Sequence, residues 1–166
     1  MTDAVQIPPD GESKMLRHTL ATLAYRGGKV LRNAPEDFAE LAIAKGSRTP
    51  VEILAHVGDL FDWALSMARD KQAWAPAAGR SWTEECDRFF TTITNFDTYL
   101  AENPISQTKA EQLFQGPIAD AFTHIGQIAL LRRVAGSPVR GENYVKAMIA
   151  TGRTGPDQPL PVYEFD

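Results

Sequence analysis

Cysteine is nearly absent from this sequence. Cys86 is the single cysteine among 166 residues, so the chain has no intramolecular disulfide and no cysteine-based zinc site. Such usage fits a reducing compartment, and we expect a cytoplasmic protein. Cys86 lies on the apolar stripe of a predicted helix, which indicates that its thiol belongs to the core and is not a nucleophile.

Long apolar runs and basic clusters are missing as well. No window approaches the roughly 18 consecutive apolar residues of a membrane helix, and residues 1–11 lack the apolar centre of a signal peptide. Lys and Arg are scattered along a chain of net charge −4, whereas nucleic-acid-binding proteins normally carry a basic face. We therefore expect a soluble protein that binds neither a membrane nor a nucleic acid.

Helical periodicity and helix-start signals are what the sequence does contain. Its 43% hydrophobic fraction is ordinary for a globular protein, and one domain accounts for residues 1–166. Apolar spacing predicts helices over about 10–33, 50–72, 82–103 and 108–134. The capping-box pattern, a Thr or Ser followed three residues later by Glu, precedes the last three helices at Thr49, Ser81 and Thr108.

Glycine and proline mark the interruptions. Gly116-Pro117 lies inside the last predicted helix, where proline removes a backbone donor, and predicts a kink or a fresh start. Residues 35–48 alternate like a strand, but they are too short and isolated to found a sheet and are interpreted as a connector. The last part of the chain is rich in Gly and Pro, with one short helix expected near 142–149. The predicted fold is all-α: an up-down four-helix bundle with its core at about 13–136 and an extended tail at 137–166.

Three polar residues lie at the edges of the predicted apolar faces. Asp120 and His124 are four residues apart and project from one face of their helix, and His56 occupies the corresponding place on the second helix. A carboxylate at a core edge is costly, and a metal ion is one partner that reverses the cost. Two imidazoles and a carboxylate resemble the three-ligand set of catalytic zinc, and the same set suits nickel or iron.

Each of these residues also has an ordinary structural interpretation. A single histidine on an apolar face is more often a hydrogen-bonded core residue than a ligand, and an Asp and a His four apart form a common helix pair. Gln127, one turn beyond His124, either orients a metal ligand from behind or makes a plain helix–helix hydrogen bond. His18, in the middle of the first helix, is interpreted as a surface or core-edge residue without a metal.

A family resemblance strengthens the metal interpretation. Residues 116–128, GPIADAFTHIGQI, followed by Leu131-Arg132-Arg133, closely resemble the last core helix of the DinB-like (YfiT-like) superfamily. The stretch from Thr49-Pro50 to His56 is similar to its second helix, and residues 142–147 and 151–153 resemble the tail of one branch. The similarity covers about residues 16–153.

The resemblance implies both a ligand set and an activity. In that superfamily one histidine of helix two and a His-x-x-x-His pair of helix four bind a single zinc or nickel ion. His56 and His124 match the first and last ligands, while Asp120 replaces the middle histidine. Members with assigned activity are thiol-dependent S-transferases or isomerases, because a metal favours the thiolate. We therefore expect one divalent ion, zinc, nickel or iron, that activates a thiol or water.

The expected partners are a small-molecule thiol and an electrophile, and the family pattern also allows a homodimer. Trp63, Phe61 and Met67 are expected to surround the electrophile with apolar surface. A ferritin-like di-iron oxidase would need Glu-x-x-His pairs on two helices, and the sequence has none. A metal-dependent hydrolase stays open, because the same ion would activate water. The third alternative is a non-catalytic bundle in which a structural metal, or none, supports a dimer or a stress-response interaction.

Overall fold

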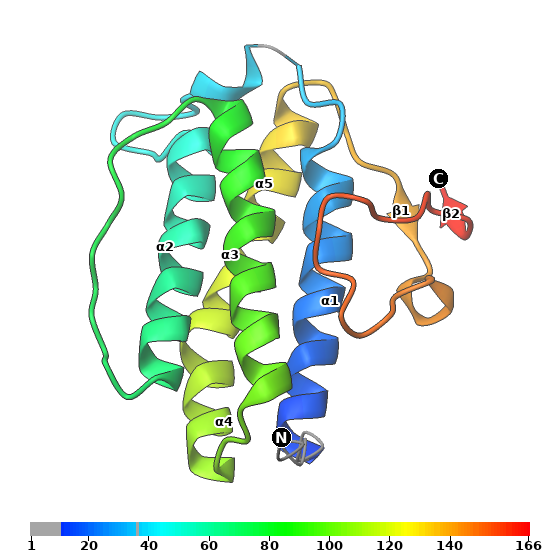
Figure 1. Cartoon of the computed structure of the whole chain (residues 1–166). Helices are drawn as coiled ribbons and strands as arrows, with labels where there is room; N and C mark the ends of the chain where they lie inside the picture. Colours follow the sequence, from blue (N-terminus) through cyan, green and yellow to red (C-terminus); the bar gives the residue numbers. More distant parts are fainter. Residues whose placement is uncertain (1–10, 36) are drawn as a thin grey trace.

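The computed structural model describes residues 11–35 and 37–166, which are mostly helical (Figure 1). The α-helices are α1 (Gly11–Leu31), α2 (Pro50–Ala68), α3 (Trp82–Glu102), α4 (Gln107–Leu113) and α5 (Ala119–Val134). Strands β1 (Gly141–Glu142) and β2 (Glu164–Phe165) pair antiparallel in the tail. This composition agrees with the all-α prediction. No helix in these described ranges has the length and apolar character that crossing a bilayer requires.

The long helices lie side by side with their axes roughly aligned (Figure 1). Helices α1 and α2 each pack against both α3 and α5. Their apolar faces meet in one core, and burying a large apolar side chain there contributes about 1.5–3 kcal/mol to folding. The largest fully buried side chains are Phe38, Phe61, Phe89, Phe96, Leu20, Leu23, Leu54, Ile93, Leu100, Leu113, Ile118 and Ile128.

Two of the three predicted capping boxes are present. The hydroxyl of Thr49 accepts a hydrogen bond from the backbone N–H of Glu52, and the Glu52 carboxylate accepts from the Thr49 N–H. Ser81 and Glu84 repeat this arrangement at the start of α3. These contacts satisfy backbone donors that a helix N-terminus otherwise leaves without partners, and they fix where each helix begins.

The capping box predicted at Thr108 is wrong. Helix α4 begins one residue earlier, and the hydroxyl of Ser106 accepts from the backbone N–H of Lys109. The Glu111 carboxylate accepts instead from the side-chain amide of Gln107, one turn away. Ser106 satisfies the helix N-terminus first, so the Thr108 pattern falls inside the helix.

Pro117 widens the helix without ending it. Between α4 and α5 the backbone forms a π-helical turn, Phe114–Ile118, so the helical path continues from Gln107 to Val134. The wider turn keeps the helical path continuous although Pro117 has no backbone N–H to donate. Asp120 follows in the first turn of α5. The predicted kink or restart is therefore a local change of helix type.

The connector at residues 35–48 contains a short 3-10 helix, Phe38–Glu40, and no strand among its described residues. Phe38 is buried, and its ring packs edge-on against Trp82 with centroids 5.5 Å apart. The connector therefore covers the core near the beginning of α3 through Phe38, whereas Ile43, which belongs to the same strand-like alternation, is exposed.

One acidic residue of α2 is not exposed, although the helical pattern places it opposite the apolar face. Asp59 is buried and accepts hydrogen bonds from the Arg88 guanidinium at 2.7 Å and from the backbone N–H of Ala77 at 3.0 Å. Arg88 also donates to the Asp62 carboxylate and to the Ala55 carbonyl. These bonds join α2, α3 and the loop at residues 69–81, and the ion pair compensates for the burial of Asp59.

The tail folds back onto α1. The Glu142 carboxylate accepts from the Tyr25 hydroxyl at 2.6 Å and from the Lys29 ammonium at 2.9 Å, and Lys29 also pairs with Glu164. Burial and the bond to Glu142 raise the pKa of Tyr25, so its hydroxyl remains a donor. In place of the expected helix near 142–149, the tail contains a 3-10 turn, Tyr144–Lys146.

Candidate metal centre

The three predicted ligands lie together at one side of the α2–α5 contact. His56 projects from α2, and Asp120 and His124 project from α5. The Nε2 atoms of His56 and His124 are 3.6 Å and 3.4 Å from the two carboxylate oxygens of Asp120. One ligand atom from each residue lies within 4.8 Å of the others, so this cluster could hold a metal ion.

The two Asp–His separations are close to the spacing of ligands around a single divalent ion, and the ligand atoms of the two histidines lie within 4.8 Å of each other. Four ligands at about 2.1 Å in a tetrahedral arrangement lie about 3.4 Å from one another, and the two Asp–His separations are 3.4 and 3.6 Å. Imidazole and carboxylate donors suit zinc, nickel and iron. Three protein donors leave a coordination position for water or for a substrate atom.

Gln127 orients His124. The Nδ1 atom of His124 lies 2.8 Å from Oε1 of Gln127, one turn further along α5. A carbonyl oxygen only accepts, so Nδ1 carries the proton in this contact and the lone pair of a neutral ring is on Nε2. That lone pair is on the nitrogen that faces Asp120.

The surroundings of His56 favour the neutral form of its ring. Burial is the main cause that lowers the pKa of His56, the charges of His124 and Arg48 add to the effect, and Asp120 opposes it. A metal ligand must be unprotonated, so a lowered pKa reduces competition from protons. The side chain of Asp120 is 47% exposed, against 21% for His56 and 12% for His124, so the centre opens to solvent on the Asp120 side.

Trp74 is a part of the site that sequence reasoning missed. Its ring lies edge-on to both His56, at 5.7 Å between centroids, and Trp63, at 5.8 Å. The loop that carries Trp74 is tied to α2 by the Asp59–Ala77 bond and by the Ser66 hydroxyl, which accepts from the Ala73 N–H. A loop residue lies outside any helical period, and its only signal is a large aromatic side chain in a polar segment.

The aromatic surroundings differ partly from the expectation. Phe61 is fully buried in the core, so the prediction that it contacts a bound electrophile is wrong. Trp63 packs against the core and contacts Trp74, and Met67 also packs against the core from a half-buried position. The aromatic surface next to His56 therefore comes from Trp63 and Trp74.

His18 and Cys86, for which the sequence predicts no metal or catalytic role, lie apart from the centre. His18 is exposed on α1, with Nδ1 3.2 Å from the Thr151 hydroxyl in the tail. Cys86 packs against the core, as predicted, and burial raises the pKa of its thiol to about 12. A thiol with this pKa is protonated at neutral pH and is a poor nucleophile.

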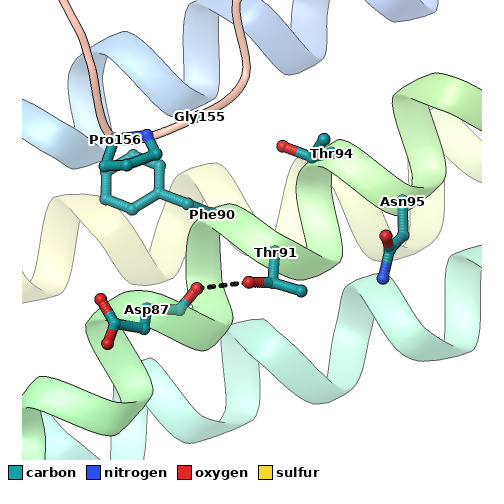
Figure 2. A pocket seen from close by; sticks show the side chains of 7 residues that line it. All are labelled: Asp87, Phe90, Thr91, Thr94, Asn95, Gly155 and Pro156. Atoms are coloured by element: carbon teal, nitrogen blue, oxygen red, sulfur yellow. Dashed lines mark hydrogen bonds between the residues drawn. The ribbon is translucent and has the colours of Figure 1, made fainter.

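Several cavities are of the size that small molecules occupy. One, of about 330 Å³, borders His124 and Gln127. A second, of about 450 Å³, lies between α3 and the tail segment with Gly155 and Pro156; Figure 2 shows its lining, in which Thr91 donates a hydrogen bond to the Asp87 carbonyl. The lining residues of this second cavity include no histidine or cysteine, so it offers no donor set comparable with the metal centre.

The scan against protein-family models finds no match to this chain, and the searches of curated proteins and of solved structures find none either.

Proposed function

We propose that the chain is a metal-dependent enzyme of the DinB-like superfamily, built as an up-down four-helix bundle, in which His56, Asp120 and His124 hold one divalent zinc, nickel or iron ion. The observation that carries this proposal is the convergence of three ligand atoms from two helices to within 4.8 Å. The family resemblance of the segments around His56 and His124 supports it.

Some residues of the centre would bind the ion, and others hold the ligands in position. A divalent ion would supply Lewis acidity, which favours the deprotonated form of a thiol or water near neutral pH. His56 and His124 present Nε2, and Asp120 supplies negative charge between them. Gln127 holds the ring of His124, and Trp74 covers one side of His56.

The reaction we propose is transfer of a small-molecule thiol to an electrophile, or a thiol-assisted isomerisation. In the transfer, the thiolate sulfur bonds to the electrophilic carbon, the leaving group departs with its electron pair, and the thiol proton goes to solvent. The reacting thiol would come from a separate small molecule, because the thiol of Cys86 is half-buried and has a pKa of about 12. Hydrolysis is the second candidate, favoured by the solvent access at Asp120.

The test measures thiol consumption by protein stripped of metal and then reloaded with zinc or nickel. Glutathione, cysteine and mercaptoethanol serve as thiols, and chlorodinitrobenzene as the electrophile. We expect turnover that needs the metal and is lost in His56→Ala, with His18→Ala as the matched histidine control. Metal-dependent ester cleavage without a thiol would replace transferase by hydrolase, and binding of metal with neither activity would favour a non-catalytic bundle.

A further inference from the structure

The cavity beside His124 combines apolar surface with a single positive charge. It lies between α2, α5 and the loop at residues 41–49. Ile43 and Leu130 form part of its wall, Arg48 contributes the charge, and His124 and Gln127 form the end nearest the metal centre. None of its described lining residues is acidic.

Arg48 forms no ion pair within the described part of the chain. Cations elsewhere form ion pairs, for example Arg17 with Asp97, Lys29 with Glu142 and Arg88 with Asp59, whereas the side chain of Arg48 is exposed. No carboxylate of residues 11–35 or 37–166 forms an ion pair with Arg48.

The backbone holds Arg48 in place from both sides. Before it, the Ser47 hydroxyl donates to the Ala44 carbonyl at 2.8 Å and accepts from the Ala44 N–H at 3.2 Å. Gly46 supplies the left-handed conformation, φ +82°, that this turn requires. After it, Thr49 caps α2. These contacts fix the backbone at position 48, while the exposed side chain of Arg48 still has to be ordered when it binds a ligand.

The apolar wall of the cavity is open. Ile43 is 54% exposed and Leu130 is 57% exposed, although both are large apolar side chains. A ligand that covers them gains the free energy of removing apolar surface from water. A molecule that also reaches Arg48 must carry a negative charge at one end.

We infer that this cavity binds the substrate of the centre, and that the substrate is a small carboxylic acid with an apolar body. Its carboxylate would lie on Arg48 and its apolar part on Ile43 and Leu130, which brings the remaining end toward His124. A planar guanidinium matches a carboxylate in a two-bond arrangement. A lone cation suits one negative charge better than the double charge of a phosphate monoester. This inference rests on the proposed function.

The experiment compares phenylacetate with its uncharged counterpart, phenylacetamide, by isothermal titration calorimetry. Both are titrated into metal-free and nickel-loaded protein, because the metal-free arm excludes coordination of the acid by the ion. We expect the acid to bind metal-free protein about three- to tenfold more tightly than the amide, in the range of partly exposed charge pairs. Arg48→Gln should abolish this preference.

Two further variants sharpen the comparison. Lys45→Gln removes an exposed positive charge from the same loop, outside the cavity lining, and should leave the preference unchanged. Leu130→Ser should weaken the acid and the amide by the same factor, because it removes apolar contact and no charge. All three positions are exposed, so circular dichroism should show unchanged helical content.

Equal affinity for acid and amide, no binding of either, or a preference that survives Arg48→Gln would overturn the inference. These outcomes are separate from a failure of the proposed function. If the protein binds no metal, the proposed function fails, while the carboxylate preference is still measured on the metal-free protein.

Discussion

Two carboxylates of this molecule, Glu142 in the tail and Asp120 in α5, both face polar partners, but they differ in the distance to those partners and in exposure to solvent. Glu142 accepts from Tyr25 at 2.6 Å and from Lys29 at 2.9 Å, and its side chain is completely buried. Asp120 faces two imidazole nitrogens at 3.4 and 3.6 Å, and its side chain is 47% exposed. Hydrogen bonds in proteins span about 2.5–3.2 Å. Glu142, Tyr25 and Lys29, the tail cluster, are therefore joined by full hydrogen bonds.

The difference distinguishes a closed structural cluster from a cluster that could hold an ion. In the tail, donors and acceptor meet at bonding distance and leave no room for a further group. At the centre, the two Asp–His separations are 3.4 and 3.6 Å, longer than the bonds in the tail, and one ligand atom from each residue lies within 4.8 Å of the others. The distances between the partners, more than the residue types, distinguish the two clusters.

The largest expected effect is the loss of metal on removing a histidine. His56→Ala and His124→Ala should each reduce bound metal from one equivalent per chain to almost none, because two remaining protein ligands hold an ion poorly. Mass-spectrometric metal analysis of protein made without a histidine tag measures this. His18→Ala should keep the full equivalent. Full occupancy in both variants would show that the assigned residues are not the ligands.

Asp120 has the next largest effect. If it is a ligand, Asp120→Ala should weaken metal binding by more than a hundredfold, whereas a residue that only orients a histidine would cost about ten- to a hundredfold. Helical content should stay nearly intact, because alanine is the best helix former. Asp120→His should retain the metal. A metal titration compares the two variants, and unchanged affinity in Asp120→Ala would remove both roles.

The tail cluster should respond in stability and not in metal content. Glu142→Gln removes the charge that faces the nearly buried ammonium of Lys29, for which Glu164 is the remaining partner. We expect unfolding free energy to fall by about 1–3 kcal/mol, the cost of an imperfectly paired buried charge. Urea denaturation measures this change, and metal analysis is the control. Loss of metal together with stability would mean that the two clusters are coupled.

The smallest effect concerns Gln127. Gln127→Leu removes the acceptor for His124 Nδ1 while keeping a similar size, and we expect metal affinity to fall by about tenfold. Stability should hardly change, because Gln127 is exposed. Competition with a fluorescent chelator resolves a tenfold difference. An affinity equal to that of the unmodified protein would show that the ring of His124 is held well enough by packing alone.

The sequence carries the information for the centre because its residues follow the helical period. A spacing of four places Asp120 and His124 on one face, and the apolar pattern of α2 indicates how His56 is turned. The helix starts at Thr49 and Ser81 are equally local, because each capping box lies within four residues. Local periodicity therefore accounts for where these three residues lie and for most helix boundaries, whereas their prediction as metal ligands depended also on the family resemblance.

What the sequence does not reveal depends on contacts between distant segments. Asp59 looks like an exposed acid on a helical wheel, and only the arrival of Arg88 from α3 makes its burial tolerable. Trp74 reaches His56 because hydrogen bonds to α2 hold its loop in place. At the start of α4, Ser106 and Thr108 are both residue types that cap helices, and in the structure it is Ser106 that accepts the capping hydrogen bond.

The π-turn at Phe114–Ile118 acts as a phase shift between α4 and α5. One extra residue in a turn rotates everything that follows by about 100° relative to a regular α-helix. The direction in which Asp120 and His124 point is therefore set by the number of residues in this turn as well as by their own identities. A regular α-helix over these same residues would turn both side chains away from His56, whereas deleting one residue of the turn would let an α-turn keep their present direction.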